Sequence, residues 1–141
     1  MAEAFRHTHR VSYAECTVGN HIYYARYLNL LEEARGEFFR NLGTSFLQLQ
    51  EQDFIFPVVE VHLKYKGPAR YDDLLTIEIQ VTELGKIRLN FGYRILNQNN
   101  VLLLEGETWH VCTGLNEKPK RAASELIEKL QNYKVEPLPK D

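Results

Sequence analysis

The sequence predicts an α+β fold in which a curved antiparallel sheet wraps around one long helix. Three observations lead to this prediction. A strongly amphipathic helical stretch follows a single N-terminal strand, a run of alternating strands follows the helix, and no internal repeat or linker breaks that order. Because only one strand precedes the helix and hairpins follow it, the pattern favours an antiparallel sheet over parallel βαβ units.

The first strand is expected at residues 5–13, where larger side chains at odd positions alternate with polar ones. This period of two is typical of a strand with one covered face. A loop at residues 14–23 follows, and from Tyr24 apolar side chains recur at the spacing of a helix with one buried stripe. Gly43 is a natural stop for that helix. With about five turns, it is long for a small domain, and we expect the other elements to pack around it.

The rest of the chain is expected to form a short helical turn, four strands and a second short helix. The helical turn is predicted near residues 45–50 and the short helix near residues 124–132. Alternating apolar side chains predict the four strands at residues 59–65, 75–84, 87–96 and 101–115. Short turns between them indicate hairpins, and residues 1–141 are expected to form a single domain.

The overall composition excludes several classes of function. A net charge of −2 and a pI near 6.2 provide no field that would attract nucleic acid or an anionic membrane. No apolar run approaches the roughly 20 residues of a membrane span, and the N-terminus lacks the apolar core of a secretory signal. Cys16 and Cys112 do not form a metal-binding spacing, and His7 and His9 lack further zinc ligands. We therefore expect a cytoplasmic protein without a metal site.

The loop before the long helix concentrates reactive side chains. Within seven residues it contains an acid, a thiol, a hydroxyl, an amide and an imidazole, namely Glu15, Cys16, Thr17, Asn20 and His21. The start of a helix presents unpaired backbone N–H groups and a partial positive charge. Such a place can hold a carbonyl oxygen that becomes negative during a reaction. The loop is therefore the first candidate for an active site.

Three stretches carry a resemblance to a known family. They are VSYAECTVGNHIYYARYLNLLEEARGEFFRNLG, VEVHLKYKGPARYDDLLTIEIQV and LLLEGETWHVCTGLNEKPKR, which occur in this order. Together they resemble the hotdog-fold acyl-CoA thioesterases, specifically the 4-hydroxybenzoyl-CoA thioesterase-like branch, over residues 6 to about 121. The resemblance implies a hotdog fold and a homodimer or homotetramer with active sites between subunits. It also implies hydrolysis of an acyl-CoA or acyl-carrier-protein thioester without a cofactor, coenzyme A being part of the substrate.

The same resemblance assigns roles to the loop. The backbone N–H of Tyr24 corresponds to the family's carbonyl-polarising donor at the helix start. The family's catalytic Asp, however, corresponds to Thr17, and the residues that follow it correspond to Asn20 and His21. The loop is also similar to that of enediyne polyketide thioesterases, which are thought to position water and substrate without a carboxylate. A threonine hydroxyl is no base at neutral pH, but it can hydrogen-bond a water molecule.

Other residues could replace the missing acid. Glu15 is the only acid in the loop and would lie beside Thr17 if the chain were extended there. Acids on the long helix are further candidates, although the pattern favours charges on the solvated face of the helix; these are Glu32, Glu33 and Glu37. Cys16 could form a nucleophilic dyad with His21, but a cysteine is more often a small buried apolar residue.

The remaining candidates concern substrate binding. Arg35 could face the site or extend its aliphatic stem along the core edge. Three strand residues could line an acyl pocket or form a polar interface rim, namely Glu60, His62 and Lys64. The cations Lys64, Lys66 and Arg70 could bind the phosphates of coenzyme A or simply face water. Because Thr17 replaces the family acid, a non-catalytic module that binds an acyl or aromatic thioester is the alternative function.

Overall fold

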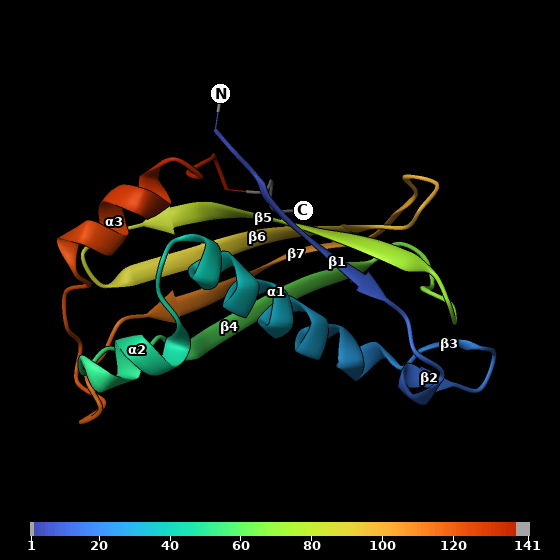
Figure 1. Cartoon of the computed structure of the whole chain (residues 1–141), viewed down its shortest axis with the longest axis horizontal. Helices are drawn as coiled ribbons and strands as arrows, with labels where there is room; N and C mark the ends of the chain where they lie inside the picture. The colour runs from blue at the N-terminus through green and yellow to red at the C-terminus, as the bar shows by residue number, and fades with distance from the viewer. Residues whose placement is uncertain (1, 138–141) are drawn as a thin grey trace.

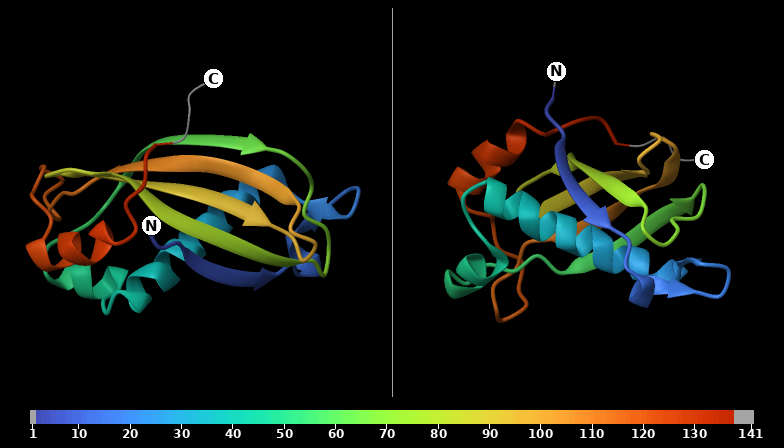
Figure 2. Two further views of the ribbon diagram at one scale, coloured as in Figure 1. Left: turned by 90° about the horizontal axis from the view of Figure 1, so that it is seen from above. Right: turned by 45° about the vertical axis from the view of Figure 1, so that its right-hand side comes forward.

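The computed structural model describes residues 2–137, and its centre is one antiparallel sheet (Figure 1). The strand order is β1-β5-β6-β7-β4. The strands are β1 (Phe5–Arg10), β4 (Val58–Tyr65), β5 (Leu74–Leu84), β6 (Arg88–Leu96) and β7 (Leu102–Val111). The helices are α1 (Tyr27–Asn41), α2 (Phe46–Glu51) and α3 (Ser124–Gln131). The sheet curves, and α1 runs across its concave face (Figure 2). This arrangement confirms the α+β prediction.

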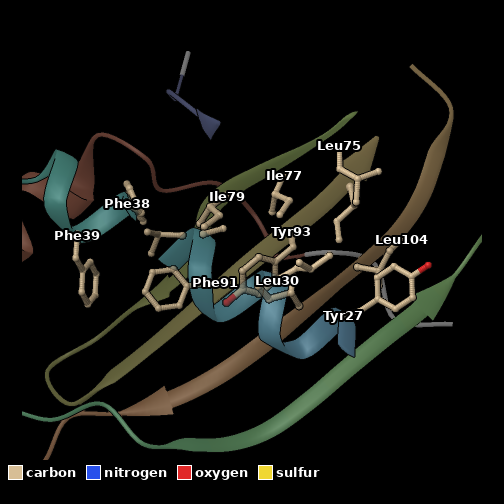
Figure 3. Close-up of a cluster of buried hydrophobic side chains, with 14 of the residues drawn as sticks. Tyr27, Leu30, Phe38, Phe39, Leu75, Ile77, Ile79, Phe91, Tyr93 and Leu104 are labelled. Atoms are coloured by element: carbon tan, nitrogen blue, oxygen red, sulfur yellow. The ribbon is translucent and has the colours of Figure 1, made fainter. Parts of the chain in front are cut away.

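The core lies between α1 and that face of the sheet. α1 buries one stripe, consisting of Tyr27, Leu30, Leu31, Ala34, Arg35, Phe38 and Phe39. The facing side chains of β5 and β6 alternate as predicted, and those of Ile77, Ile79, Phe91 and Tyr93 are fully buried. Figure 3 shows the aromatic rings of both layers in the same cluster. The long helix is therefore the element that covers the sheet.

Beside the candidate loop, two boundaries differ from the sequence prediction. Elsewhere, β7 ends at Val111 and not at the predicted residue 115, because Thr113 instead forms isolated bridges to Ile55 and Pro119. The first strand ends at Arg10, because Ser12 caps a 3₁₀ turn at Tyr13–Glu15. The α-helix begins at Tyr27, and a second 3₁₀ turn covers Tyr24–Arg26. The differences in the first strand and in the helix lie beside the candidate loop. They shape the backbone at the point where the helix begins.

The two ends of α1 lie in different surroundings (Figure 1). Its first residues lie beside the small hairpin of β2 (Cys16–Thr17) and β3 (His21–Ile22), whereas its last residues lie near α2 and α3. Within residues 2–137, no helix has both the length and the apolar character that crossing a membrane requires.

The sheet ends in two edge strands, β1 and β4. β4 pairs only with β7, and seven of its eight residues are exposed. The sequence alternation suggested a strand with one covered face, but in this chain Leu63 alone is partly covered. Because apolar Val59, Val61 and Tyr65 remain exposed, this edge is available for an interaction with another surface.

Candidate active site

The predicted reactive loop folds into a small hairpin at the start of α1. β2 (Cys16–Thr17) pairs with β3 (His21–Ile22), and the N–H of Asn20 donates to the Thr17 carbonyl at 3.1 Å. Gly19 and Asn20 have φ values of 91° and 60°, a left-handed conformation that glycine and asparagine tolerate best. The side chains of Thr17 and Asn20 are exposed, and neither hydrogen-bonds to any residue in 2–137.

The turn between β4 and β5 holds this hairpin in place. The N–H of Ile22 donates to the Ala69 carbonyl at 2.8 Å, and Arg70 Nη1 donates to the Gly19 carbonyl at 3.0 Å. The N–H of Ala69 in turn donates to Tyr27 Oη at 3.1 Å. Arg70, predicted as a phosphate ligand, therefore supports the hairpin. Sequence reasoning missed this positioning role and that of Ala69, which acts through its backbone.

The helix start presents the expected free donors. The first hydrogen bond of the 3₁₀ turn runs from the N–H of Arg26 to the Tyr23 carbonyl at 2.9 Å. The N–H groups of Tyr24 and Ala25 precede it, and no side chain caps them. The Tyr24 carbonyl accepts a hydrogen bond from Tyr65 Oη at 3.0 Å. β4 therefore helps to orient the peptide that begins the helix.

Glu15 does not lie in an extended segment beside Thr17, because it ends the first 3₁₀ turn. Its carboxylate accepts from the N–H of Ser12 at 2.8 Å and lies 2.8 Å from His9 Nε2. Burial alone would raise the pKa of Glu15, but the Ser12 N–H and His9 lower it below its ordinary value. A carboxylate that is stabilised in its charged form and already bonded is a weak proton acceptor.

The three acids of α1 have different environments. Glu33 Oε2 lies 2.7 Å from His7 Nε2 and 3.1 Å from His9 Nδ1, so this carboxylate faces β1. Glu37 pairs with Arg40 at 2.6 Å on the surface. Only Glu32 lines the cavity described below. Among residues 2–137, no group of three or more histidine, cysteine or acidic side chains is arranged to hold a metal ion.

The loop cysteine and histidine are directed to different partners. Cys16 Sγ donates to the Ser12 carbonyl at 3.6 Å, whereas His21 Nδ1 lies 3.1 Å from the Ile22 carbonyl. Because a carbonyl only accepts, Nδ1 carries the proton, and in the neutral ring His21 Nε2 is an acceptor. No hydrogen bond joins Cys16 to His21 in the described chain, so the structure does not form the hypothetical dyad.

A cavity of about 400 Å³ lies further along α1, beneath α2. Its walls are largely aromatic, with side chains Phe39, Phe46, Phe54, Phe56 and Phe91. Its polar lining comes mainly from Glu32, Arg35 and His110. The size is that of a small-molecule pocket. Among the predicted binding residues, only Arg35 lines it.

Arg35 begins a chain of buried hydrogen bonds that crosses the sheet. Its Nη1 donates to Tyr93 Oη at 2.9 Å, Tyr93 Oη lies 2.6 Å from Thr108 Oγ1, and Thr108 Oγ1 lies 2.8 Å from His110 Nε2. His110 Nδ1 donates to the Phe56 carbonyl at 2.9 Å. This last bond determines the direction of the others. With the proton of the neutral ring on Nδ1, His110 Nε2 accepts from the Thr108 hydroxyl, and Thr108 Oγ1 in turn accepts from the Tyr93 hydroxyl.

The buried position of His110 leads us to expect that the protein loses stability in acid. Burial lowers the pKa of His110 to about 4, from an ordinary value of 6.5. Above pH 6.5 the ring is neutral in both states, but as pH falls toward 4 the unfolded chain binds a proton that the folded chain refuses. The free energy of unfolding should therefore fall across this window, by at most about 1.4 kcal/mol per pH unit from this residue.

Urea unfolding between pH 7 and pH 4 checks this prediction. His110→Gln, which retains a donor and an acceptor without titrating, should flatten the pH dependence. His62→Gln is the matched control, because the His62 side chain is 56% exposed. Equal pH slopes for His110→Gln and the unchanged protein would contradict the assignment.

The predicted strand residues lie away from the cavity. His62 packs against Trp109, with the ring centres 5.0 Å apart. The neighbours of Trp109 in β7, Thr108 and His110, belong to the buried chain beneath α1, so Trp109 points to the opposite face of the sheet. Glu60 and Lys64 share the His62 side of β4 by alternation. Within one chain these three residues do not line the cavity. Lys66, which was predicted to bind phosphate, lies with its Nζ 3.7 Å from Glu105 Oε1.

The family assignment rests on the sequence itself. Residues 19–104, which include β3, α1 and the aromatic wall of the cavity, match the family described as the Thioesterase superfamily. The chain belongs to this superfamily. The hotdog fold inferred from the three sequence stretches is thereby confirmed.

Individual relatives agree with the family assignment. The chain is 34% identical to the acyl-CoA thioester hydrolase YbgC of Escherichia coli over 124 residues, which cover 87% of this chain and 92% of YbgC. It is 31% identical to the 1,4-dihydroxy-2-naphthoyl-CoA hydrolase of Synechococcus elongatus, covering 79% and 81% of the two chains. The dynemicin thioesterase superposes with a TM-score of 0.88 at 18% identity over 94% and 99% of the chains, which shows a shared fold. The protein is therefore a thioesterase.

Proposed function

We propose that this thioesterase hydrolyses an acyl-CoA thioester at the β2–β3 hairpin, with the thioester carbonyl bound at the start of α1. The observation that carries the proposal is the convergence of free groups there. The uncapped N–H groups of Tyr24 and Ala25 lie beside the hairpin that displays Thr17 and Asn20. Relatives named as acyl-CoA hydrolases support the choice of substrate.

The chemistry requires water activation without a loop carboxylate. In the proposed mechanism, Thr17 and Asn20 hold a water molecule against the carbonyl carbon, and the Tyr24 N–H donates to the carbonyl oxygen. His21 Nε2 accepts the proton of the water as the new carbon–oxygen bond forms. Collapse of the tetrahedral intermediate breaks the carbon–sulfur bond, and His21 returns the proton to the departing thiolate. No metal or dissociable cofactor takes part in these steps.

The rest of the substrate has two natural binding regions. The aromatic cavity would receive the acyl group, because its walls are apolar and it lies along the helix from the hairpin. The phosphates of coenzyme A would meet the cations near the end of β4 and in the following turn, namely Lys64, Lys66 and Arg70. Arg70 could serve there through the N–H groups that do not bind Gly19.

A homodimer or homotetramer is part of the proposal. The edge strand β4 has free hydrogen-bonding groups on one side, and the apolar side chains of Val59, Val61 and Tyr65 are exposed along it. Pairing with a second copy would cover both. Glu60, His62 and Lys64 would then lie near that interface.

Light scattering at micromolar concentration should give two or four times the monomer mass of 16.5 kDa. Val61→Glu should shift the protein toward a monomer, since it places a charge in the proposed interface. Val101→Glu is the matched control, because Val101 is similarly exposed in the β6–β7 turn. A monomer before any substitution would refute the assembly.

Turnover on a panel of thioesters tests the function. We expect release of free thiol from acyl-CoA substrates, measured beside the same acyl groups on an acyl-carrier protein. Faster turnover of the carrier-protein substrates would mean that the natural acyl group is delivered on a carrier protein and not on coenzyme A. Tight binding of acyl-CoA without release of thiol would establish the alternative, a non-catalytic thioester-binding module suggested by Thr17.

A further inference from the structure

Arg35 is a buried cation that has no carboxylate partner among residues 2–137. It is 9% exposed, it lines the cavity, and its single hydrogen bond within residues 2–137 uses one of its five N–H groups. In the described part of the chain, Glu32, the acid that also lines the cavity, forms no ion pair with Arg35. A buried guanidinium is costly unless its remaining donors are satisfied. Whatever occupies the cavity must therefore supply acceptor atoms to Arg35.

The hydrogen-bond chain orients the Arg35 guanidinium. Tyr93, Thr108 and His110 are neutral, and each donates in the direction away from Arg35. Burial raises the pKa of Tyr93 and lowers that of His110, so neither can replace Arg35 as a charge or supply a counter-charge. The cavity thus combines aromatic walls with one fixed cationic donor. A plain hydrocarbon group would fill the walls but leave that donor without an acceptor.

The position along the helix separates this donor from the proposed reaction centre. Arg35 lies eleven positions after Tyr24, across the 3₁₀ turn and the first turns of α1, which corresponds to roughly 16–18 Å along the helix axis. The Tyr24 N–H is the proposed partner of the thioester carbonyl. An oxygen bound by Arg35 therefore belongs to a different, more distal part of the acyl group.

We propose that the cavity selects acyl groups that carry a distal oxygen acceptor, a keto, hydroxyl or carboxylate oxygen, which Arg35 binds while Tyr93, Thr108 and His110 position the guanidinium. This inference rests on the proposed thioesterase function and specifies its substrate class. Arg35 acts as a specificity-determining residue. The three others act through it as positioning residues.

The test compares matched acyl-CoA substrates. The probes are dodecanoyl-CoA, a series of oxododecanoyl-CoAs with the keto group at successive carbons, and the ω-hydroxy and ω-carboxy derivatives. At one or more positions, kcat/KM should exceed that of dodecanoyl-CoA by about 10- to 100-fold. Arg35→Met, which retains an unbranched apolar stem, should reduce this ratio to near one. Tyr93→Phe removes the orienting hydroxyl and should lower the ratio while leaving the charge in place.

Distinct outcomes would overturn the inference. No preference at any position would exclude an acceptor-binding role for Arg35. An equal loss of kcat for plain and oxygenated substrates in Arg35→Met would instead assign Arg35 to the thioester carbonyl. If no acyl-CoA is hydrolysed, the proposed function fails, but calorimetric binding of dodecanoate and its oxygenated counterparts still decides the inference. Tighter binding of an oxygenated acid that Arg35→Met abolishes would support it, and equal binding would refute it.

Discussion

Asn20→Gly is expected to lower the turnover of an acyl-CoA substrate by about 10²–10³-fold, equivalent to roughly 2.7–4 kcal/mol of transition-state stabilisation. Asn20 lies at φ 60°, so glycine retains the turn without strain and the substitution removes only the amide side chain. That amide makes no hydrogen bond within residues 2–137 and is free to hold water or substrate. The fold should therefore be little affected while the proposed chemistry is lost.

The chain offers a matched control for this substitution. Asn100 has the same φ of 60° and lies in the turn between β6 and β7. Asn100→Gly should leave both turnover and melting temperature close to those of the unchanged protein. The measurement is kcat together with the thermal unfolding midpoint for both variants. If Asn20→Gly retains full turnover, the reaction takes place elsewhere on the chain.

Phe38→Ala should produce the largest loss of stability, about 3–5 kcal/mol in the free energy of unfolding. Phe38 is fully buried on α1, and its ring lies 5.3 Å from that of Phe5 and 4.8 Å from that of Tyr133. It also meets Phe91 at 6.2 Å. One truncation thus removes contacts among the first strand, the central sheet and the C-terminal segment. Little of the resulting void can close, because several elements border it.

Urea unfolding measures this effect against a second aromatic truncation. Phe46→Ala is the control, since Phe46 is 42% exposed on α2. Its truncation removes the same number of atoms but less buried surface, so the loss should be clearly smaller. Similar losses for the two variants would mean that α1 does not organise the core in the way that the packing indicates.

Much of the fold followed from local patterns. The alternation in β5 and β6 predicted their buried faces because a strand turns successive side chains to opposite sides. The stripe of α1 was readable for the corresponding reason, with a period of 3.6 residues. In β4 the same alternation was less informative. A strand at the edge of a sheet has fewer neighbours, so Val59 and Val61 remain exposed in the single chain.

The candidate site was less predictable than the fold. The loop, its free helix-start donors and the replacement of an acid by Thr17 could all be identified from the sequence. The positioning contacts of Arg70 and Ala69 could not, because they join segments about fifty residues apart in the chain. Glu15 illustrates the same limit, since a 3₁₀ turn directs its carboxylate to Ser12 and His9.

The sequence by itself determined the α+β class, the order of the elements and membership of a thioesterase family, because periodicity and local motifs are properties of neighbouring residues. Only the tertiary structure revealed the aromatic cavity and the chain from Arg35 through Tyr93 and Thr108 to His110. These side chains come from α1, β6 and β7, and each alone is indistinguishable from an ordinary core residue. Their shared cavity and hydrogen bonds arise only when the sheet curves around the helix and brings distant segments into contact.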